Sequence, residues 1–416
     1  MTYSRVLPFL YLVLVTTAYA QEPLANKGFL DAQSTDLSQS KLALSGEWIH
    51  YENQLLEPTE LKNPNSDIVI FPMLWNDPRD SKSGTGFGTY QLTVLLPANH
   101  QSLLALEIPQ IYSSYKIWVN EKVVASNGIT GKTKEETTAQ WLPQTISFEN
   151  TSDTLSVVIQ IANFHHHNGG SKDPIYLGTG EALGQFHERA VTGNLAEAIV
   201  LTIIGIGFLI IFFLYNKQKV IMYFLLLCLT WALRSVFSNL YLAISYFPDF
   251  NWELMVKIEY LTLYLTMIWS ILFLGRLFSH ESSKIVKYFL VIGNIFFVVF
   301  TLVTPALTYT RWLPAYLALS VILIIYALVI VIMALINDRA GVQSVVVGVL
   351  LGLVLFAYDV IAYEGFLRYN AVIFSIGYLV IFSMLGVALL FHLRIFKSTS
   401  QADSVLTFDD LYKTKK

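Results

Sequence analysis

Three observations predict a chain of two parts, an all-β sandwich followed by an all-α bundle of seven transmembrane helices. Between about residues 42 and 180, apolar and polar residues alternate in short runs, as in strands with one buried face. From residue 195 to about 393 the sequence is almost continuously apolar, in seven segments that are each near the roughly 20 residues needed to cross a membrane. Hydrophobic residues make up 54% of the 416 residues and charged ones only 14%, which indicates lipid contact because soluble proteins carry about 25% charged residues.

Residues 1–20 have the pattern of a secretory signal peptide. Arg5 supplies the positive start, the apolar stretch after it is short for a membrane span, and Ala18-Tyr19-Ala20 forms a small-x-small cleavage site. We expect the mature chain to begin at Gln21, with residues 21–41 as a polar segment before the sandwich. An uncleaved anchor is the alternative, and either way the following residues are exported.

The strands of the sandwich follow from alternation and from turn residues. Apolar residues alternate with polar ones over 90–96 and 155–161, and residues 115–119 and 122–125 form a hairpin around Asn120-Glu121. Short apolar runs predict further strands at 68–71, 103–108 and 144–148.

The composition excludes several classes of function. The net charge of −3 gives no basic field for nucleic acid, and Cys228, the single cysteine, excludes an intrachain disulfide and a CxxC site. No paired carboxylates, nucleophile elbow or phosphate-binding glycine loop is recognisable. We therefore expect binding rather than catalysis, with no catalytic residue, metal or cofactor.

Aromatic and polar residues in the sandwich are the candidate ligand site. Trp75, Tyr112 and Trp141 are expected stacking platforms, with core packing as the alternative. His165, His167 and Asn168 lie in a segment that we expect to be a binding loop. The alternatives for the histidines are local hydrogen bonding and metal binding, for which no further ligands are evident.

The seven predicted spans are 195–215, 220–240, 254–275, 285–304, 315–335, 342–363 and 371–393. Residues 181–194 form the predicted linker, and Asn194 with Glu197 has the spacing of a capping box at the first span. An exported start and seven crossings place the tail, 394–416, in the cytoplasm. Positive residues agree, since most of them fall at the inner ends of the spans.

Three charges lie inside the predicted spans, all in the outer part of the membrane. They are Arg234, Glu259 and Asp359. A charge in the membrane costs at least about 2.5 kcal/mol and is usually paired. We expect Arg234 to pair with Asp359 or Glu259, with separate snorkelling to the headgroups as the alternative.

The first part of the chain resembles the galactose-binding-like jelly rolls that precede the catalytic barrel of many β-glycosidases. The matching motifs are Gly46-Glu47-Trp48, Gly88-Thr89-Tyr90, Trp118-Val119-Asn120 and Gly169-Gly170, in that order. Glu121 departs from the pattern, which usually has glycine after the asparagine. The resemblance implies a jelly-roll sandwich over residues 42–180.

The second part resembles bacterial seven-transmembrane receptors with diverse intracellular signalling modules. The motifs are Trp231-Ala232-Leu233-Arg234-Ser235, Phe247-Pro248-Asp249 and Glu259-Tyr260-Leu261-Thr262. The resemblance implies a multi-pass protein of the bacterial inner membrane, with a periplasmic sandwich that senses a small molecule or carbohydrate. Relatives usually continue into a cytoplasmic output domain, for which the tail is too short, so we expect a separate signalling partner protein.

Two other functions remain open. A transporter or permease component predicts polar residues near the membrane midplane, whereas the charges here lie in the outer third. A membrane-anchored carbohydrate-binding envelope protein has little need of seven spans.

Overall fold

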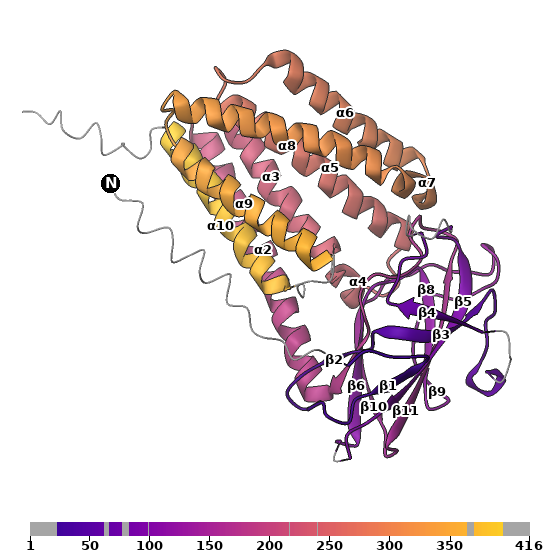
Figure 1. Ribbon diagram of the computed structural model, residues 1–416. Helices are drawn as coiled ribbons and strands as arrows, with labels where there is room; N and C mark the ends of the chain where they lie inside the picture. Colours follow the sequence, from indigo (N-terminus) through magenta and orange to yellow (C-terminus); the bar gives the residue numbers. More distant parts are fainter. Residues whose placement is uncertain are drawn as a thin grey trace, which may run out of the picture. The chain divides into compact units, whose positions relative to one another are not determined.

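The computed structural model describes residues 23–61, 66–76, 83–98, 100–215, 217–238, 240–363 and 370–393. The predicted signal peptide and the tail 394–416 lie outside these residues. The chain divides into an all-β unit, ending at Gly184, and a helical unit that comprises 185–416 together with His165–His167 (Figure 1).

The all-β unit is a sandwich of two main sheets, which confirms the predicted fold class. The larger sheet has the order β4-β3-β5-β11-β8-β9, with β1 beside β5, and the smaller has the order β10-β6-β13-β2. A third, two-stranded sheet pairs β12 with β7. The strands are β1 (Phe29–Asp31), β2 (Leu42–Ala43), β3 (Gly46–Glu52), β4 (Asp67–Phe71), β5 (Gly86–Leu95), β6 (Leu103–Ile108), β7 (Ile111–Tyr112), β8 (Ser114–Val119), β9 (Lys122–Asn127), β10 (Gln144–Glu149), β11 (Thr154–Asn163), β12 (Gly170–Ser171) and β13 (Tyr176–Thr179).

Alternation along the strands builds one apolar core. On β5, Tyr90, Leu92 and Val94 are buried and face the core, while Gln91 and Thr93 alternate with them. Leu104 and Leu106 of β6 belong to the same core. The core therefore lies between the inward faces of the two sheets, as period-two patterning requires.

The predicted hairpin joins β8 and β9. Both turn residues have positive φ, 47° at Asn120 and 69° at Glu121, which is the conformation of a type I′ hairpin turn. The Asn120 side chain also accepts a hydrogen bond from the Ser156 N–H at 2.8 Å. Glu121 thus occupies a left-handed position that usually favours glycine.

A segment that the sequence did not predict lies on the outer face of the larger sheet. Residues 53–61, called the strap below, follow β3 and include the 3₁₀ turn η2 (Pro58–Glu60). No side chain of the strap is fully buried.

The helical unit contains seven long helices in the described residues, in agreement with the seven predicted spans. They are α2 (Gly180–Leu214), α3 (Lys219–Phe237), α5 (Trp252–Leu277), α6 (Lys284–Val303), α8 (Leu313–Ile336), α9 (Val342–Tyr363) and α10 (Ala371–His392), with short helices α4 (Leu242–Tyr246) and α7 (Ala306–Arg311) between them. Six are long and apolar enough to cross a membrane, and the described apolar part of α9, Val342–Leu355, is shorter.

Large apolar side chains on the outside of this unit face no protein. On α6, Ile285 is 84% exposed and Val303 is 74% exposed, while Leu290 on the same helix is buried in the bundle core. Such surfaces require lipid around them. The unit is therefore built as a multi-pass membrane protein.

The first helix differs from the prediction at its start. Asn194 does not cap a helix, because α2 begins at Gly180 and Asn194 lies in its interior. The residues of the predicted linker have no helix breaker apart from glycines, and helical turns continue through them. Asn194 and Glu197 are instead both buried.

Candidate functional site

Trp75 lies at one end of the sandwich beside two glycines. Its indole N–H donates a hydrogen bond to the Tyr90 hydroxyl at 2.7 Å. Burial raises the pKa of Tyr90 above its ordinary value, which the hydrogen bond from Trp75 partly offsets. A Cβ atom on Gly169 or Gly170 would collide with the Trp75 ring, and Gly170 has a φ of +80°. Only glycine allows the chain to approach the indole this closely.

Tyr112 and Trp141 meet at the same end. Tyr112 of β7 is paired in register with Gly170 of β12, so it is one strand away from the glycines that contact Trp75. Its ring packs edge-to-face against Trp141, with centroids 5.3 Å apart. Trp141 is only 2% exposed, so it supports the Tyr112 ring, which is half-buried.

Asn168 completes this group, which we call the aromatic end: Trp75, Tyr112, Trp141, Asn168 and Gly170. The Asn168 side-chain oxygen accepts a hydrogen bond from Asn76 at 3.0 Å, and its carbonyl accepts one from the buried Asn163 at 2.8 Å. Four of the six predicted ligand-binding residues are therefore gathered by β7, β12 and the segment before β12.

The two predicted histidines belong to the helical unit instead. The His165 ring lies 6.1 Å from the Trp252 ring, and the His167 N–H donates to the Thr310 hydroxyl at 3.1 Å. Burial and then the charge of Arg311 lower the pKa of His167, which favours its neutral form. Within the described residues, no three metal-binding side chains cluster.

The structure brings Arg234 and Glu259 together through the backbone. An Arg234 Nη1 group donates to the Glu259 carbonyl at 2.8 Å, and the Glu259 carboxylate accepts a hydrogen bond from the Tyr241 hydroxyl at 3.3 Å. Asp359, the third predicted charge, has a side chain outside the described residues. Arg234 thus links α3 to α5 by satisfying a main-chain acceptor.

A buried polar group on α2 was missed by the sequence analysis. The Glu197 carboxylate accepts a hydrogen bond from the Trp231 indole at 2.8 Å, which ties α2 to α3. One turn away, Ser375 donates to the Asn194 side chain at 3.3 Å and ties α10 to α2. The spacing of Asn194 and Glu197 predicts a capping box, so their role as contacts between helices was not predicted. An acidic residue at the start of a long apolar segment was the feature of the sequence that could have indicated a buried contact.

A second polar group that the sequence did not predict joins two loops of the helical unit. Glu281, between α5 and α6, accepts a hydrogen bond from the Arg339 Nε at 2.5 Å and one from Asn337 at 3.2 Å. The Glu281 side chain is 2% exposed and that of Arg339 is 39% exposed. Tyr326 of α8 adds a hydrogen bond to the Ser283 carbonyl at 3.0 Å. These contacts hold the α5–α6 loop against the α8–α9 loop.

Solved structures resemble the chain over about a third of its length. A β-glucuronidase from Faecalibacterium prausnitzii is 15% identical, with 34% of this chain and 32% of that chain covered and a TM-score of 0.26. A putative β-galactosidase from Bacteroides fragilis is 15% identical over 34% of this chain and 23% of that chain, with a TM-score of 0.26. This chain thus spans a third or less of the length of these enzymes. No curated protein matches it.

The helical unit has a family match. Residues 198–397 match the family described as 7TM diverse intracellular signalling. This range begins within α2 and takes in every later helix of the bundle. It confirms the resemblance that the Arg234 and Glu259 motifs predicted. Over this range, the seven-helix part of the protein matches the 7TM diverse intracellular signalling family.

Proposed function

We propose that the protein is a membrane receptor whose all-β unit binds an exported solute and whose helices pass the signal to a separate partner protein. The observation that carries the proposal is the family match over residues 198–397, which supports a signalling role for the bundle. A jelly-roll sandwich preceding such a bundle is suited to recognition, because a rigid scaffold presents its loops for binding.

The aromatic end is the proposed binding site. The half-buried Tyr112 ring offers an edge supported from behind by Trp141, and Trp75 is held in place by its hydrogen bond to Tyr90. Fixed aromatic rings beside amide groups such as Asn168 suit a saccharide, whose ring faces are apolar and whose edges carry hydroxyls.

Signalling requires the ligand to favour one packing of the helices over another. The ties between α2, α3 and α10 at Glu197 and Asn194 are discrete contacts that such a change would remake. A cytoplasmic or membrane partner would read the result. We propose the bacterial inner membrane as the location, with the sandwich in the periplasm.

A thermal-shift screen of saccharides against the full chain in lipid nanodiscs tests this proposal. A ligand at 100 times its Kd stabilises the folded protein by about 2.7 kcal/mol. We expect Tyr112→Ala to abolish the ligand-dependent shift, because it removes the accessible ring of the site. Tyr246→Ala is the matched control, since Tyr246 is an exposed aromatic residue of α4. An undiminished shift in Tyr112→Ala would exclude the aromatic end as the site.

A further inference from the structure

A polar row crosses the outer face of the larger sheet beneath the strap. Tyr51 of β3 is paired in register with Thr89 of β5, Thr89 with Gln160 of β11, and Gln160 with Lys116 of β8. Their neighbours along the strands, such as Tyr90 and Ile159, face the core, so the row points away from it. Four strands at about 4.8 Å spacing make the row about 14 Å long.

Each member of the row makes a polar contact with the strap. Tyr51 donates to the Leu61 carbonyl at 2.9 Å, and the Thr89 hydroxyl donates to the Gln54 carbonyl at 2.8 Å. The same hydroxyl accepts the Leu56 N–H at 2.9 Å.

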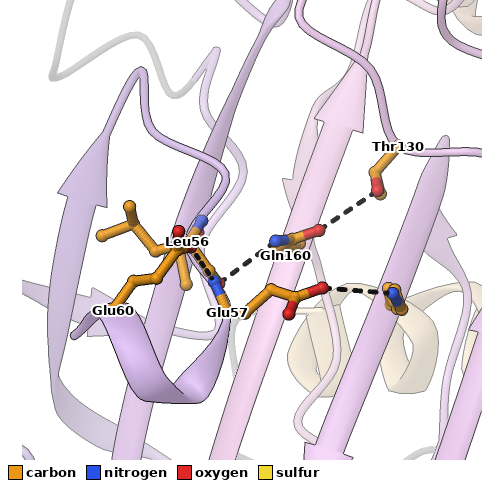
Figure 2. A network of polar contacts seen from close by, with 7 residues as sticks. Leu56, Glu57, Glu60, Thr130 and Gln160 are labelled. Carbon is orange, nitrogen blue, oxygen red and sulfur yellow. Dashed lines mark hydrogen bonds and ion pairs between the residues drawn. The ribbon is translucent and has the colours of Figure 1, made fainter. Parts of the chain in front are cut away.

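Gln160 lies at the centre of these contacts. Its Nε2 donates to the Leu56 carbonyl at 3.1 Å and its Oε1 accepts from the Thr130 hydroxyl at 3.3 Å, so one buried amide joins the strap to a second loop (Figure 2). Gln160 is 6% exposed. A buried amide of this kind needs partners at both ends, and any molecule that replaced the strap would have to supply an acceptor here.

The end of the row carries a charge that the strap only weakly neutralises. The Lys116 Nζ lies 4.7 Å from the Trp118 ring centroid and 3.9 Å from a Glu57 carboxylate oxygen. The side chains of Lys116 and Glu57 are 37% and 60% exposed. Exposed pairs of this length contribute little, so another carboxylate can replace Glu57 at small cost.

The strap itself has the features of a segment that opens locally. None of its side chains is fully buried, and its contacts with the row are hydrogen bonds and one ion pair. Segments with few buried apolar contacts open at much lower free energy than the core of a domain. The buried side chains of Tyr51, Thr89 and Gln160 beneath it would then become accessible.

We propose that the polar row is a binding face for a carboxylate-bearing saccharide and that the strap is a displaceable occupant of it, with Glu57 standing in for the ligand carboxylate. Hydroxyl groups of the saccharide accept hydrogen bonds from Tyr51 and Gln160 and donate one to Thr89, in place of the strap backbone. The carboxylate of the saccharide pairs with Lys116. The inference rests on the proposed function for the premise that the all-β unit binds a saccharide, and it names a face distinct from the aromatic end.

Binding of a mannuronate trimer to the full chain in nanodiscs, with mannotriose as the uncharged match, tests this inference. Glu57→Gln removes the competing carboxylate, so we expect it to tighten trimer binding about two- to fivefold, the range of an exposed ion pair. Lys116→Gln is expected to weaken binding by a similar factor. Glu121→Gln and Lys122→Gln are the matched controls, because both residues are exposed and lie at the β8–β9 turn, whereas Lys116 pairs with Ser126 farther along the hairpin.

Hydrogen exchange reports the strap directly. We expect the trimer to accelerate exchange at the Leu56 amide, since a ligand that displaces the strap frees this amide from the Thr89 hydroxyl. Unchanged or slower exchange, equal effects of the two Gln variants, or displacement by an acidic peptide and not by the trimer would overturn the inference. If mannotriose binds as well as the trimer and its binding is lost in Tyr112→Ala, the receptor function stands and this inference alone fails.

Discussion

Glu281 shows how tertiary contacts determine the pKa of one side chain. Burial raises the pKa of its carboxyl group, but hydrogen bonds from Arg339 and Asn337 and the charge of Arg339 outweigh it, so the pKa lies below its ordinary value. A carboxyl group with a lowered pKa stabilises the folded state above its unfolded pKa. That contribution is lost as the pH falls through the folded pKa.

The Glu281 contact therefore predicts an acid-sensitive tie between loops. Arg339→Gln is expected to lower the free energy of unfolding by about 1–3 kcal/mol at pH 7, because it leaves a buried carboxylate without its cation. The difference from the unchanged protein should shrink below about pH 4, as Glu281 becomes protonated in both. Thermal unfolding in nanodiscs as a function of pH measures it.

Lys284→Gln is the matched control for this tie, since Lys284 lies at the same end of α6 and makes no ion pair in the described part of the chain. A pH-independent effect of Arg339→Gln would contradict the ion-pair explanation.

The ligand-binding role of the candidate residues stays a prediction, and their placement depends on tertiary contacts. Trp75 packs against Gly169 and Gly170, Tyr112 pairs with Gly170, and Trp141 packs on Tyr112. The position of a residue was harder to predict where its sequence pattern fits two different roles. The spacing of Asn194 and Glu197 favours a cap, yet both are buried in the interior of α2.

At the scale of elements, the β8–β9 hairpin combines a predictable turn with an unusual residue. The two-residue turn pairs Val119 with Lys122, and the register shifts between Ile117 and Trp118. Asn120 tolerates a left-handed conformation. Glu121 is in the same conformation with a φ of 69°, which costs an ordinary residue roughly 1–2 kcal/mol. Glu121, which stands where the jelly-roll pattern usually has glycine, therefore keeps the same turn at an energetic cost.

Glu121→Gly is expected to stabilise the all-β unit by up to about 1 kcal/mol. The gain is the relieved left-handed conformation, reduced by the roughly 0.5–1 kcal/mol of extra freedom that glycine has in the unfolded chain. Calorimetry of the full chain measures it. Glu149→Gly, at the end of β10 where φ is negative, should instead destabilise, and stabilisation by both variants would refute the explanation.

The strap illustrates an element that pattern reading misses. Its residues show no alternation or helical period, and its order comes from side chains on β3, β5 and β11 that hydrogen-bond to its backbone. Contacts between backbone and distant side chains leave no periodic trace in the segment itself. The long helices were easier to predict from the sequence. A long apolar run needs a lipid or protein environment over its whole length, so the run itself marks the helix.

At the scale of the whole molecule, the proposed topology predicts on which side of the membrane each loop lies. An odd number of crossings puts the α4–α5 loop and the α5–α6 loop on opposite sides of the membrane. In cells with a permeable outer membrane, an impermeant maleimide should label Asp249→Cys and leave His280→Cys unlabelled until the inner membrane is opened. Both positions are exposed, and the native Cys228 is buried and adds little background. Labelling of both variants in intact cells would contradict the orientation.

The sequence by itself determined the two-part architecture, the approximate ends of the long helices apart from the start of α2, and the strands with clear alternation. Those features depend on how apolar residues repeat along the chain, a local property. Tertiary structure decided the partner of Arg234, the burial of Glu197, the gathering of the aromatic end and the strap over the polar row. Each of these joins residues far apart in the chain, and their meeting depends on packing that no short stretch of sequence encodes.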